Sequence, residues 1–343
     1  MRKITKTLFA VLSSFAISVS SFAGELTVSG SATGTYVVGG ASQHQSKGLG
    51  ITNELNFTAA GELDNGYAWT YSMELDDAAT KNDDTQIKLT GDLGTFGLCI
   101  TECGLSVELD YGVGAVGTGS DYINTSTVTW GFDVSSYNNV QYSTPSGLLP
   151  FGVNASVAYV PNLSGAQGAS QKAVPTSETR LVADDATMYK LTASPSDGVS
   201  VGADFFTSSG SVVSGTQKQE SGSVYIKYSA GPLTVGAAET RAAPSYTAGT
   251  DTAAYRYDTT AVGVQFAVND QLSVSMGREK SEKYTQGTGA LANKQVEQTV
   301  DSIQAAYTIG GATLGIVNTQ ADDADYITSR ESKATVFSMA LAF

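Results

Sequence analysis

A run of carboxylates with no basic residue among them is the chemically most distinctive feature of this 343-residue chain. No Lys or Arg occurs from Leu89 to Gln171, although this 83-residue stretch holds six carboxylates. Five of them lie between positions 102 and 136: Glu102, Glu108, Asp110, Asp121 and Asp133. A cluster of one charge sign attracts counter-ions, most strongly where low-dielectric walls focus the field. We therefore expect this segment to draw in cations.

Two other kinds of chemistry are disfavoured. A hydrolase needs a general base, and the only histidine, His44, lies between two glutamines in a predicted loop, so we do not expect an enzyme. Runs of aspartate also occur in predicted long loops, but without EF-hand spacing, which favours solvated carboxylates over a divalent-cation site. These runs are Asp76-Asp77, Asp83-Asp84, Asp184-Asp185, and Asp322-Asp323 with Asp325. We expect no metal, cofactor or nucleic-acid partner.

Cys99 and Cys103 are the only cysteines. In an oxidising compartment an isolated pair usually forms a disulfide. In an extended strand, however, their Cα atoms would be about 13 Å apart, which is beyond the limit for a bridge. A bridge therefore requires a turn over residues 100–102. We predict that the disulfide forms; in the alternative interpretation both thiols stay free.

The elements that must position these residues are strands, because apolar side chains recur at every second position. Residues 67–75, for example, place five large apolar side chains on one parity. The chain ends in the same way, with Phe337, Met339, Leu341 and Phe343 on one parity and small residues between them. Counting all such segments, including a weak strand at residues 98–100, predicts sixteen strands.

Short turns and long polar loops alternate along these strands, which places both termini on the short-turn side. An apolar face on every strand with a polar opposite face predicts a closed antiparallel barrel that has lipid outside and water inside. Seven short turns are predicted, at Asp64-Asn65-Gly66, Leu93 to Gly97, Pro145-Ser146-Gly147, Ser196-Asp197-Gly198, Ala230-Gly231, Asn269-Asp270 and Gly310-Gly311.

The first 23 residues have the layout of a secretory signal peptide. Three basic residues precede a short apolar stretch, and Ser21-Phe22-Ala23 supplies small residues at the two positions that a signal peptidase reads. The alternative is an amphipathic helix that the mature protein keeps. We predict a signal peptide at 1–23 and a barrel at 24–343. Removal of the signal leaves 16 Lys and Arg against 33 Asp and Glu, a net charge of -17.

Over essentially the whole mature chain, the sequence resembles the general diffusion porins of Gram-negative outer membranes. The segments that carry the resemblance are GDLGTFG (91–97), SYNNVQYSTPSG (136–147) and the terminal aromatic strand. The resemblance implies an all-β transmembrane antiparallel β-barrel of 16 strands with short periplasmic turns and long external loops. It also implies a homotrimer in outer-membrane lipid, recognition of Phe343 by the barrel-insertion machinery, and passage of small hydrophilic solutes and ions.

The resemblance further implies that the third long loop, from about Glu102 to Ser136, folds into the pore as a constriction. Such loops usually face arginines on the barrel wall, but Gln141 stands here where a basic residue is common. Lys88 is the clearest remaining wall cation, and Lys190 and Lys227 share its inward parity. We expect a cation-preferring channel. The alternative is a surface adhesin or structural barrel, which would have the same strands but a plugged lumen.

Overall fold

The structure is a computed structural model of the chain. It describes residues 25–39, 47–76, 84–123, 130–163, 185–209, 216–247, 254–285 and 294–343. The predicted signal peptide, His44 and the aspartates at 77, 83 and 184 lie outside the described residues. The expectations placed on them therefore stay predictions.

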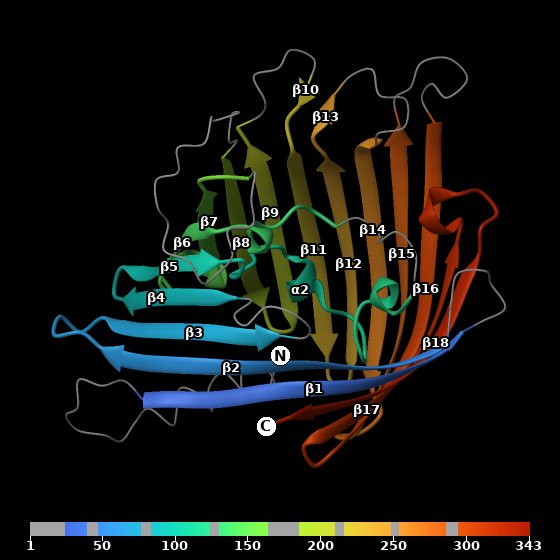
Figure 1. Ribbon diagram of the computed structural model, residues 1–343, viewed down its shortest axis with the longest axis horizontal. Helices are drawn as coiled ribbons and strands as arrows, with labels where there is room; N and C mark the ends of the chain where they lie inside the picture. Colours follow the sequence, from blue (N-terminus) through green and yellow to red (C-terminus); the bar gives the residue numbers. More distant parts are fainter. Residues whose placement is uncertain are drawn as a thin grey trace.

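The described residues form one closed barrel of 16 antiparallel strands, as predicted (Figure 1). Each strand pairs with its neighbours along the chain, and β18 returns to β1. The strands are β1 (Glu25–Gly39), β2 (Gly48–Glu62), β3 (Ala68–Asp76), β4 (Thr85–Gly91), β5 (Gly94–Ile100), β6 (Asn139–Ser143), β7 (Asn154–Val160), β8 (Ala186–Ser196), β9 (Val199–Ser208), β11 (Glu220–Ala230), β12 (Leu233–Ala243), β14 (Ala254–Ala267), β15 (Leu272–Thr285), β16 (Lys294–Ile309), β17 (Ala312–Asp322) and β18 (Ser332–Ala342).

Closure of the barrel depends on the last residues of the chain. Ala342 pairs with Ser31, and Phe343 exchanges two backbone hydrogen bonds with Gly30, at 2.8 and 3.0 Å. The end of the last strand therefore lies beside Gly30 of β1. Within hydrocarbon an unpaired strand edge would leave its N–H and C=O groups without partners, so closure is obligatory.

The apolar parity of the strands faces outward. Val224, Ile226 and Tyr228, alternate residues of β11, have side chains that are about half exposed, and Phe343 is 71 % exposed. Exposed apolar side chains in a continuous belt are costly in water but stable in lipid. The lipid-facing surface thus follows the predicted period of two.

One predicted turn is misplaced. The segment from Leu93 to Gly97 was expected to be a turn, but the chain reverses at Asp92-Leu93 and β5 already begins at Gly94. Phe96 stands on the outer face of β5 beside Tyr142 of β6, with ring centroids 5.0 Å apart. Glycines on either side of Phe96 conceal the alternation in the sequence.

Three small features outside the barrel strands were not predicted. A separate pair of two-residue strands, β10 (Thr216–Gln217) and β13 (Tyr246–Thr247), links two of the long loops. The loop between β17 and β18 contains the 3-10 helix η6 (Ala324–Tyr326), and the connection between β6 and β7 contains η4 (Pro150–Gly152). Among the described residues, no helix is both long enough and apolar enough to span a membrane.

Candidate functional site

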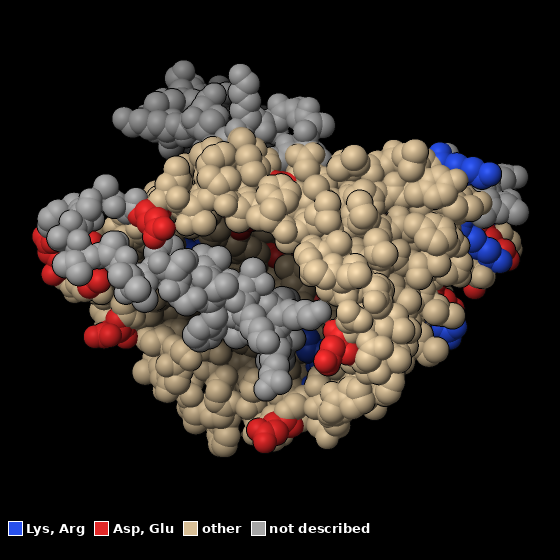
Figure 2. Space-filling view, turned by 90° about the horizontal axis from the view of Figure 1, so that it is seen from below, with Lys and Arg blue, Asp and Glu red and all other residues tan. Residues whose placement is uncertain are grey.

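The loop between β5 and β6 folds into the barrel. Its described parts, residues 101–123 and 130–138, contain the α-helix α2 (Glu108–Tyr111) and the 3-10 helices η2 (Gly119–Tyr122) and η3 (Val134–Ser136). Figure 1 shows α2 within the outline of the barrel, beside β11 and β12. Figure 2 shows a hollow in the molecule, with acidic and basic side chains visible inside it.

Backbone N–H groups of this loop bond to inward-facing side chains of one wall. Val107 N–H donates to Asp204 Oδ2 of β9 over 2.8 Å, and Ala115 N–H donates to Ser275 Oγ of β15 over 2.8 Å. Gly119 N–H donates to Glu279 Oε1 of β15 over 3.0 Å. Thr319 of β17 in turn donates its hydroxyl to the Gly119 carbonyl over 3.2 Å. The loop therefore lies along the wall from β9 to β17.

Small wall residues make room for the loop. A Cβ atom on Gly236 of β12 would lie 2.8 Å from Val113 Cγ2, and a Cβ atom on Gly263 of β14 would lie 2.9 Å from Val113 Cγ1. Both distances are shorter than van der Waals contact allows. Tyr111 packs at the same place, in a buried cluster with Trp130 and wall residues of β11, β12 and β14. The glycines thus allow the loop backbone to approach the sheet closely.

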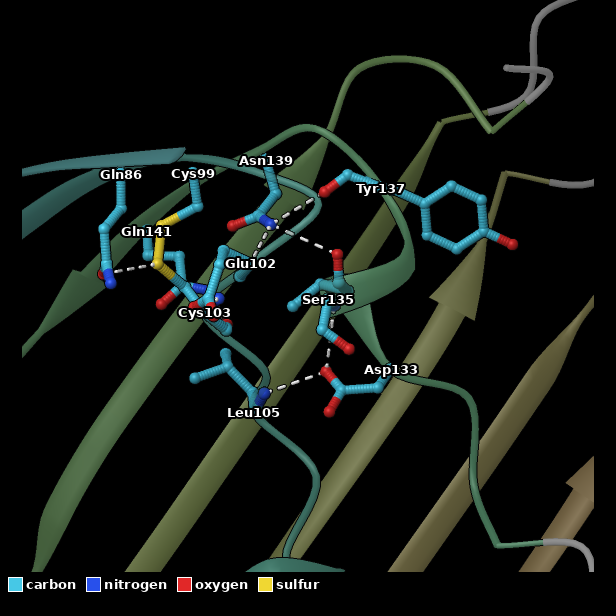
Figure 3. The surroundings of a disulfide bond; sticks show 11 residues. Gln86, Cys99, Glu102, Cys103, Leu105, Asp133, Ser135, Tyr137, Asn139 and Gln141 are labelled. Carbon is cyan, nitrogen blue, oxygen red and sulfur yellow. Dashed lines mark hydrogen bonds between the residues drawn. A yellow bond between two sulfur atoms is a disulfide. The ribbon is translucent and has the colours of Figure 1, made fainter. Parts of the chain in front are cut away.

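The root of the loop is fixed by the disulfide between Cys99 and Cys103 (Figure 3). Their Cα atoms are 6.0 Å apart, within the range of a bridge. The turn that brings them together has two residues in the left-handed region, Thr101 at φ 52° and Cys103 at φ 64°. Non-glycine residues rarely adopt this conformation. The structure thus contains both the predicted bridge and the turn that it requires.

Two side chains of β6 hold the loop beside this disulfide. The Gln141 amide donates to the Cys103 carbonyl. The buried Asn139 amide lies 3.1 Å from the Glu102 carbonyl and 3.2 Å from the Val134 carbonyl, so it bonds to both ends of the loop (Figure 3). Gln141 therefore stands at the wall position that the resemblance assigns to a basic residue, but it supplies a hydrogen bond to the loop and no charge. Sequence reasoning did not find Asn139.

Two of the predicted constriction carboxylates are engaged in contacts that hold the loop. Asp110 Oδ2 lies 2.6 Å from Lys190 Nζ of β8, and Lys227 of β11 donates to the Asp110 carbonyl. Asp133 accepts hydrogen bonds from Leu105 N–H at 2.8 Å and Ser106 N–H at 3.0 Å. Both carboxylates thus have close partners within the loop or on the wall.

Glu108 and Asp121, the other two carboxylates of the loop beyond its root, are close enough to repel each other. Burial, followed by repulsion from Asp121, Glu279, Asp133 and Asp204, raises the pKa of Glu108 to about 8. Burial also raises the pKa of Asp121, although the residue remains partly open to solvent. Glu108 is therefore mostly protonated, and so uncharged, at neutral pH. From the sequence alone it was counted as a negative charge.

The opposite part of the wall is not covered in this way. No described residue of β1 to β4 is buried, whereas inward-facing residues of β7 to β9 and of most later strands are. Glu54 of β2 and Glu74 of β3 lie on this uncovered wall, on the parity opposite to the outward-facing apolar residues. Lys88 of β4 and Glu102 interact electrostatically beside them. Sequence reasoning missed both Glu54 and Glu74, although their parity was readable.

The described residues contain no group of His, Cys, Asp and Glu side chains arranged to hold a metal ion. In the last long loop, Asp325 Oδ2 lies 2.6 Å from Arg330 Nη1, and Asp323 accepts a hydrogen bond from Ser329 N–H. These aspartates therefore have protein partners.

Comparison with known structures identifies the same fold. A porin refined at 1.8 Å resolution aligns with a TM-score of 0.64 at 12 % identity, over 93 % of this chain and 100 % of that one. OmpT of Vibrio cholerae, in a trimer form, aligns with a TM-score of 0.65 at 12 % identity, over 94 % and 100 %. An anion-selective porin from Comamonas acidovorans aligns with a TM-score of 0.63 at 13 % identity, over 93 % and 100 %. At these identities the likeness establishes the fold alone.

Sequence comparison establishes the family. No curated protein matches this chain. The family model described as "Gram-negative porin", however, matches residues 7–338, which is nearly the whole chain. Together with the closed 16-stranded barrel and its inserted loop, this match shows that the chain belongs to the Gram-negative porins, the channel-forming barrels of the outer membrane.

Proposed function

We propose that this porin is a passive channel for small hydrophilic solutes and ions, and that it prefers cations. The observation that carries the proposal is the excess of carboxylates inside the barrel, both on the inserted loop, which has no basic residue, and on the uncovered wall at Glu54 and Glu74. Selectivity in a wide aqueous channel follows the sign of the charge near its narrowest section. The barrel fold does not fix this sign, since an anion-selective porin has the same fold.

Reversal potentials in planar bilayers test the charge preference. Under a KCl gradient at low salt, we expect a potential whose sign indicates the preferred passage of potassium. The preference should weaken as salt rises, because the Debye length falls from about 30 Å at 0.01 M to about 3 Å at 1 M. A preference for chloride at low salt would contradict the proposal.

Conductance separates the channel from the alternative of an adhesin or structural barrel. A passive channel should give stable single-channel steps whose conductance rises in proportion to salt at high concentration. Liposomes that contain the protein should swell in neutral sugars, at rates that fall steeply with sugar size. A barrel with a plugged lumen would give neither result, and saturable uptake of one sugar would contradict general diffusion.

We further propose the assembly and processing that the family resemblance implies. The mature chain begins after residue 23, inserts through recognition of the terminal Phe343, and forms a homotrimer in outer-membrane lipid. A structure of OmpT in a trimer form supports the trimer for this fold. Light scattering of the purified protein, corrected for detergent, should give three times the protomer mass, and N-terminal sequencing should begin at Gly24. The channel needs no catalytic residue or cofactor.

A further inference from the structure

We propose that Glu54 and Glu74 on the uncovered wall, acting with Glu102, determine the charge selectivity of this channel, and that the carboxylates of the inserted loop contribute less. The inference rests on the cation preference proposed above and names the residues responsible for it. Three independent features of the structure carry it: the partners of the loop carboxylates, the exposure of the wall carboxylates, and the balance of charge at each place.

The loop carboxylates have partners that reduce their field. Asp110 lies between Lys190 and Lys227, so this group of three carries a net charge of +1. The Asp133 carboxylate accepts backbone N–H groups of residues 105 and 106 and sits against the loop. Glu108 is mostly protonated near neutral pH because burial raises its pKa to about 8. Beyond the root of the loop, Asp121 is the one predicted carboxylate residue that is exposed to solvent, and burial raises its pKa as well.

The wall carboxylates beneath the loop are removed from solvent. Asp204 and Glu279 are 6 % and 8 % exposed, and each accepts a hydrogen bond from a loop N–H group. A permeating ion cannot reach them without displacing the loop. Their charges therefore serve to anchor the loop, since a buried carboxylate is stable only where it is hydrogen-bonded.

Glu54 and Glu74, in contrast, lie on strands where no described residue is buried. Glu54 of β2 is exposed. Asn56, two residues further along β2, lies directly opposite Glu74 of the neighbouring strand β3. The Asn56 side chain hydrogen-bonds Glu74 and so orients its carboxylate. Glu74 also interacts electrostatically with Glu54 and Glu102. Glu102, whose Oε2 accepts the Cys103 N–H over 2.7 Å at the root of the loop, is thus close enough to act with the two wall carboxylates.

Acidic side chains outnumber basic ones in this group. Among the described residues, Lys88 is the basic residue that interacts with it, against Glu54, Glu74 and Glu102. Neighbouring carboxylates on a solvated wall repel each other, and a passing cation relieves that repulsion whereas an anion adds to it. The uncovered wall therefore favours cations at the place where solutes meet it directly.

Two matched double variants test the inference. Glu54→Gln with Glu74→Gln and Glu108→Gln with Asp110→Asn each replace two carboxylates by amides of nearly the same size. The measurement is the potassium-to-chloride permeability ratio, from reversal potentials at low salt. We expect the wall variant to lower the ratio by about twofold or more, toward one, and the loop variant to lower it less. Asp197→Asn with Asp270→Asn, in exposed short turns, is the control for a loss of two charges elsewhere.

The outcomes separate this inference from the proposed function. If the wild-type channel prefers chloride or shows no preference, the proposed function fails, and the inference fails with it. If the wild type prefers potassium but the loop variant lowers the ratio as much as the wall variant or more, the inference alone is overturned. Heat-dependent gel mobility of each variant verifies that the barrel has folded. A second wall variant, Glu54→Lys with Glu74→Lys, should reverse the preference to chloride.

Discussion

Removal of the Asp204 carboxylate should release the inserted loop from the wall. Asp204 is 6 % exposed, and its two oxygens accept from different backbone groups: Oδ2 from Val107 N–H of the loop at 2.8 Å, and Oδ1 from Ser223 N–H of β11 at 3.0 Å. Asp204→Ala leaves both N–H groups without an acceptor. Asp204→Asn keeps one oxygen acceptor and leaves one N–H group facing an amide nitrogen.

The expected magnitude follows from this count. A buried polar group left without its partner costs about 1–3 kcal/mol. Asp204→Asn should therefore favour loop opening by about 1–3 kcal/mol, and Asp204→Ala by about 2–6 kcal/mol. The lower ends of these ranges are the better expectation, because each variant also removes the cost of burying a charge. At about 1.4 kcal/mol for each factor of ten, opening should increase about 5-fold in the asparagine variant and about 25-fold in the alanine variant.

Hydrogen exchange measured by mass spectrometry reports this opening directly. Peptides that contain Val107 should exchange faster in Asp204→Ala than in Asp204→Asn, and faster in both than in wild type. Peptides from β17 and β18 should not change, because the barrel itself is intact. The matched control is Asp197→Asn, in an exposed turn. Unchanged exchange around Val107 in the alanine variant would refute the assignment of Asp204 as an anchor of the loop.

Three further predictions concern pH, oxidation and lipid. Raising the pH from 6 to 9.5 should increase the cation preference, because Glu108, with a pKa of about 8, is protonated below that value and ionised above it; Glu108→Gln should make this pH-dependent increase smaller, and an undiminished increase would contradict the assignment. Alkylation of the unreduced protein, followed by mass spectrometry, should modify neither Cys99 nor Cys103, and two modified thiols would show that the bridge is absent. Met339→Lys, on the outer face, should lower the yield of folded barrel much more than Ser338→Lys, on the inner face. The reason is that a lipid-facing cation near the midplane of the membrane costs about 2–4 kcal/mol. Equal yields of the two variants would refute the assignment of faces.

The barrel was predictable because lipid imposes a local pattern on each strand. Alternate residues of β11 are apolar and outward-facing, and this pattern is readable without knowledge of any partner strand. The misplaced turn at Leu93 to Gly97 shows where the pattern fails. Gly94 and Gly97 have no side chain to signal a face, so the first half of β5, in which Phe96 is the one large outward side chain, resembled a turn. Strand signals depend on side chains, and glycine gives none.

The inserted loop was only partly predictable, since its contacts join residues that are distant in the sequence. The disulfide could be predicted because its two cysteines are only four residues apart, so that a bridge between them requires a turn in the chain. The contact between Asp110 and Lys190 joins residues 80 positions apart and depends on the path of the loop across the barrel. No local pattern specifies that path. It depends on where glycines such as Gly236 and Gly263 allow the backbone to approach the wall.

Inward parity is therefore necessary for a residue to act on permeating ions, but it is not sufficient. Lys190 and Lys227 share the inward parity of Lys88, and counted from the sequence they would make the channel less favourable to cations. In the structure both lysines contact Asp110 of the loop. They therefore neutralise one of the five carboxylates that the sequence assigned to the constriction. Asp110 with its two lysines carries no negative charge overall, whereas Glu54, Glu74 and Glu102 outnumber the one lysine beside them, Lys88. The electrical character of the channel thus depends less on the total charge than on which part of the wall the loop leaves uncovered.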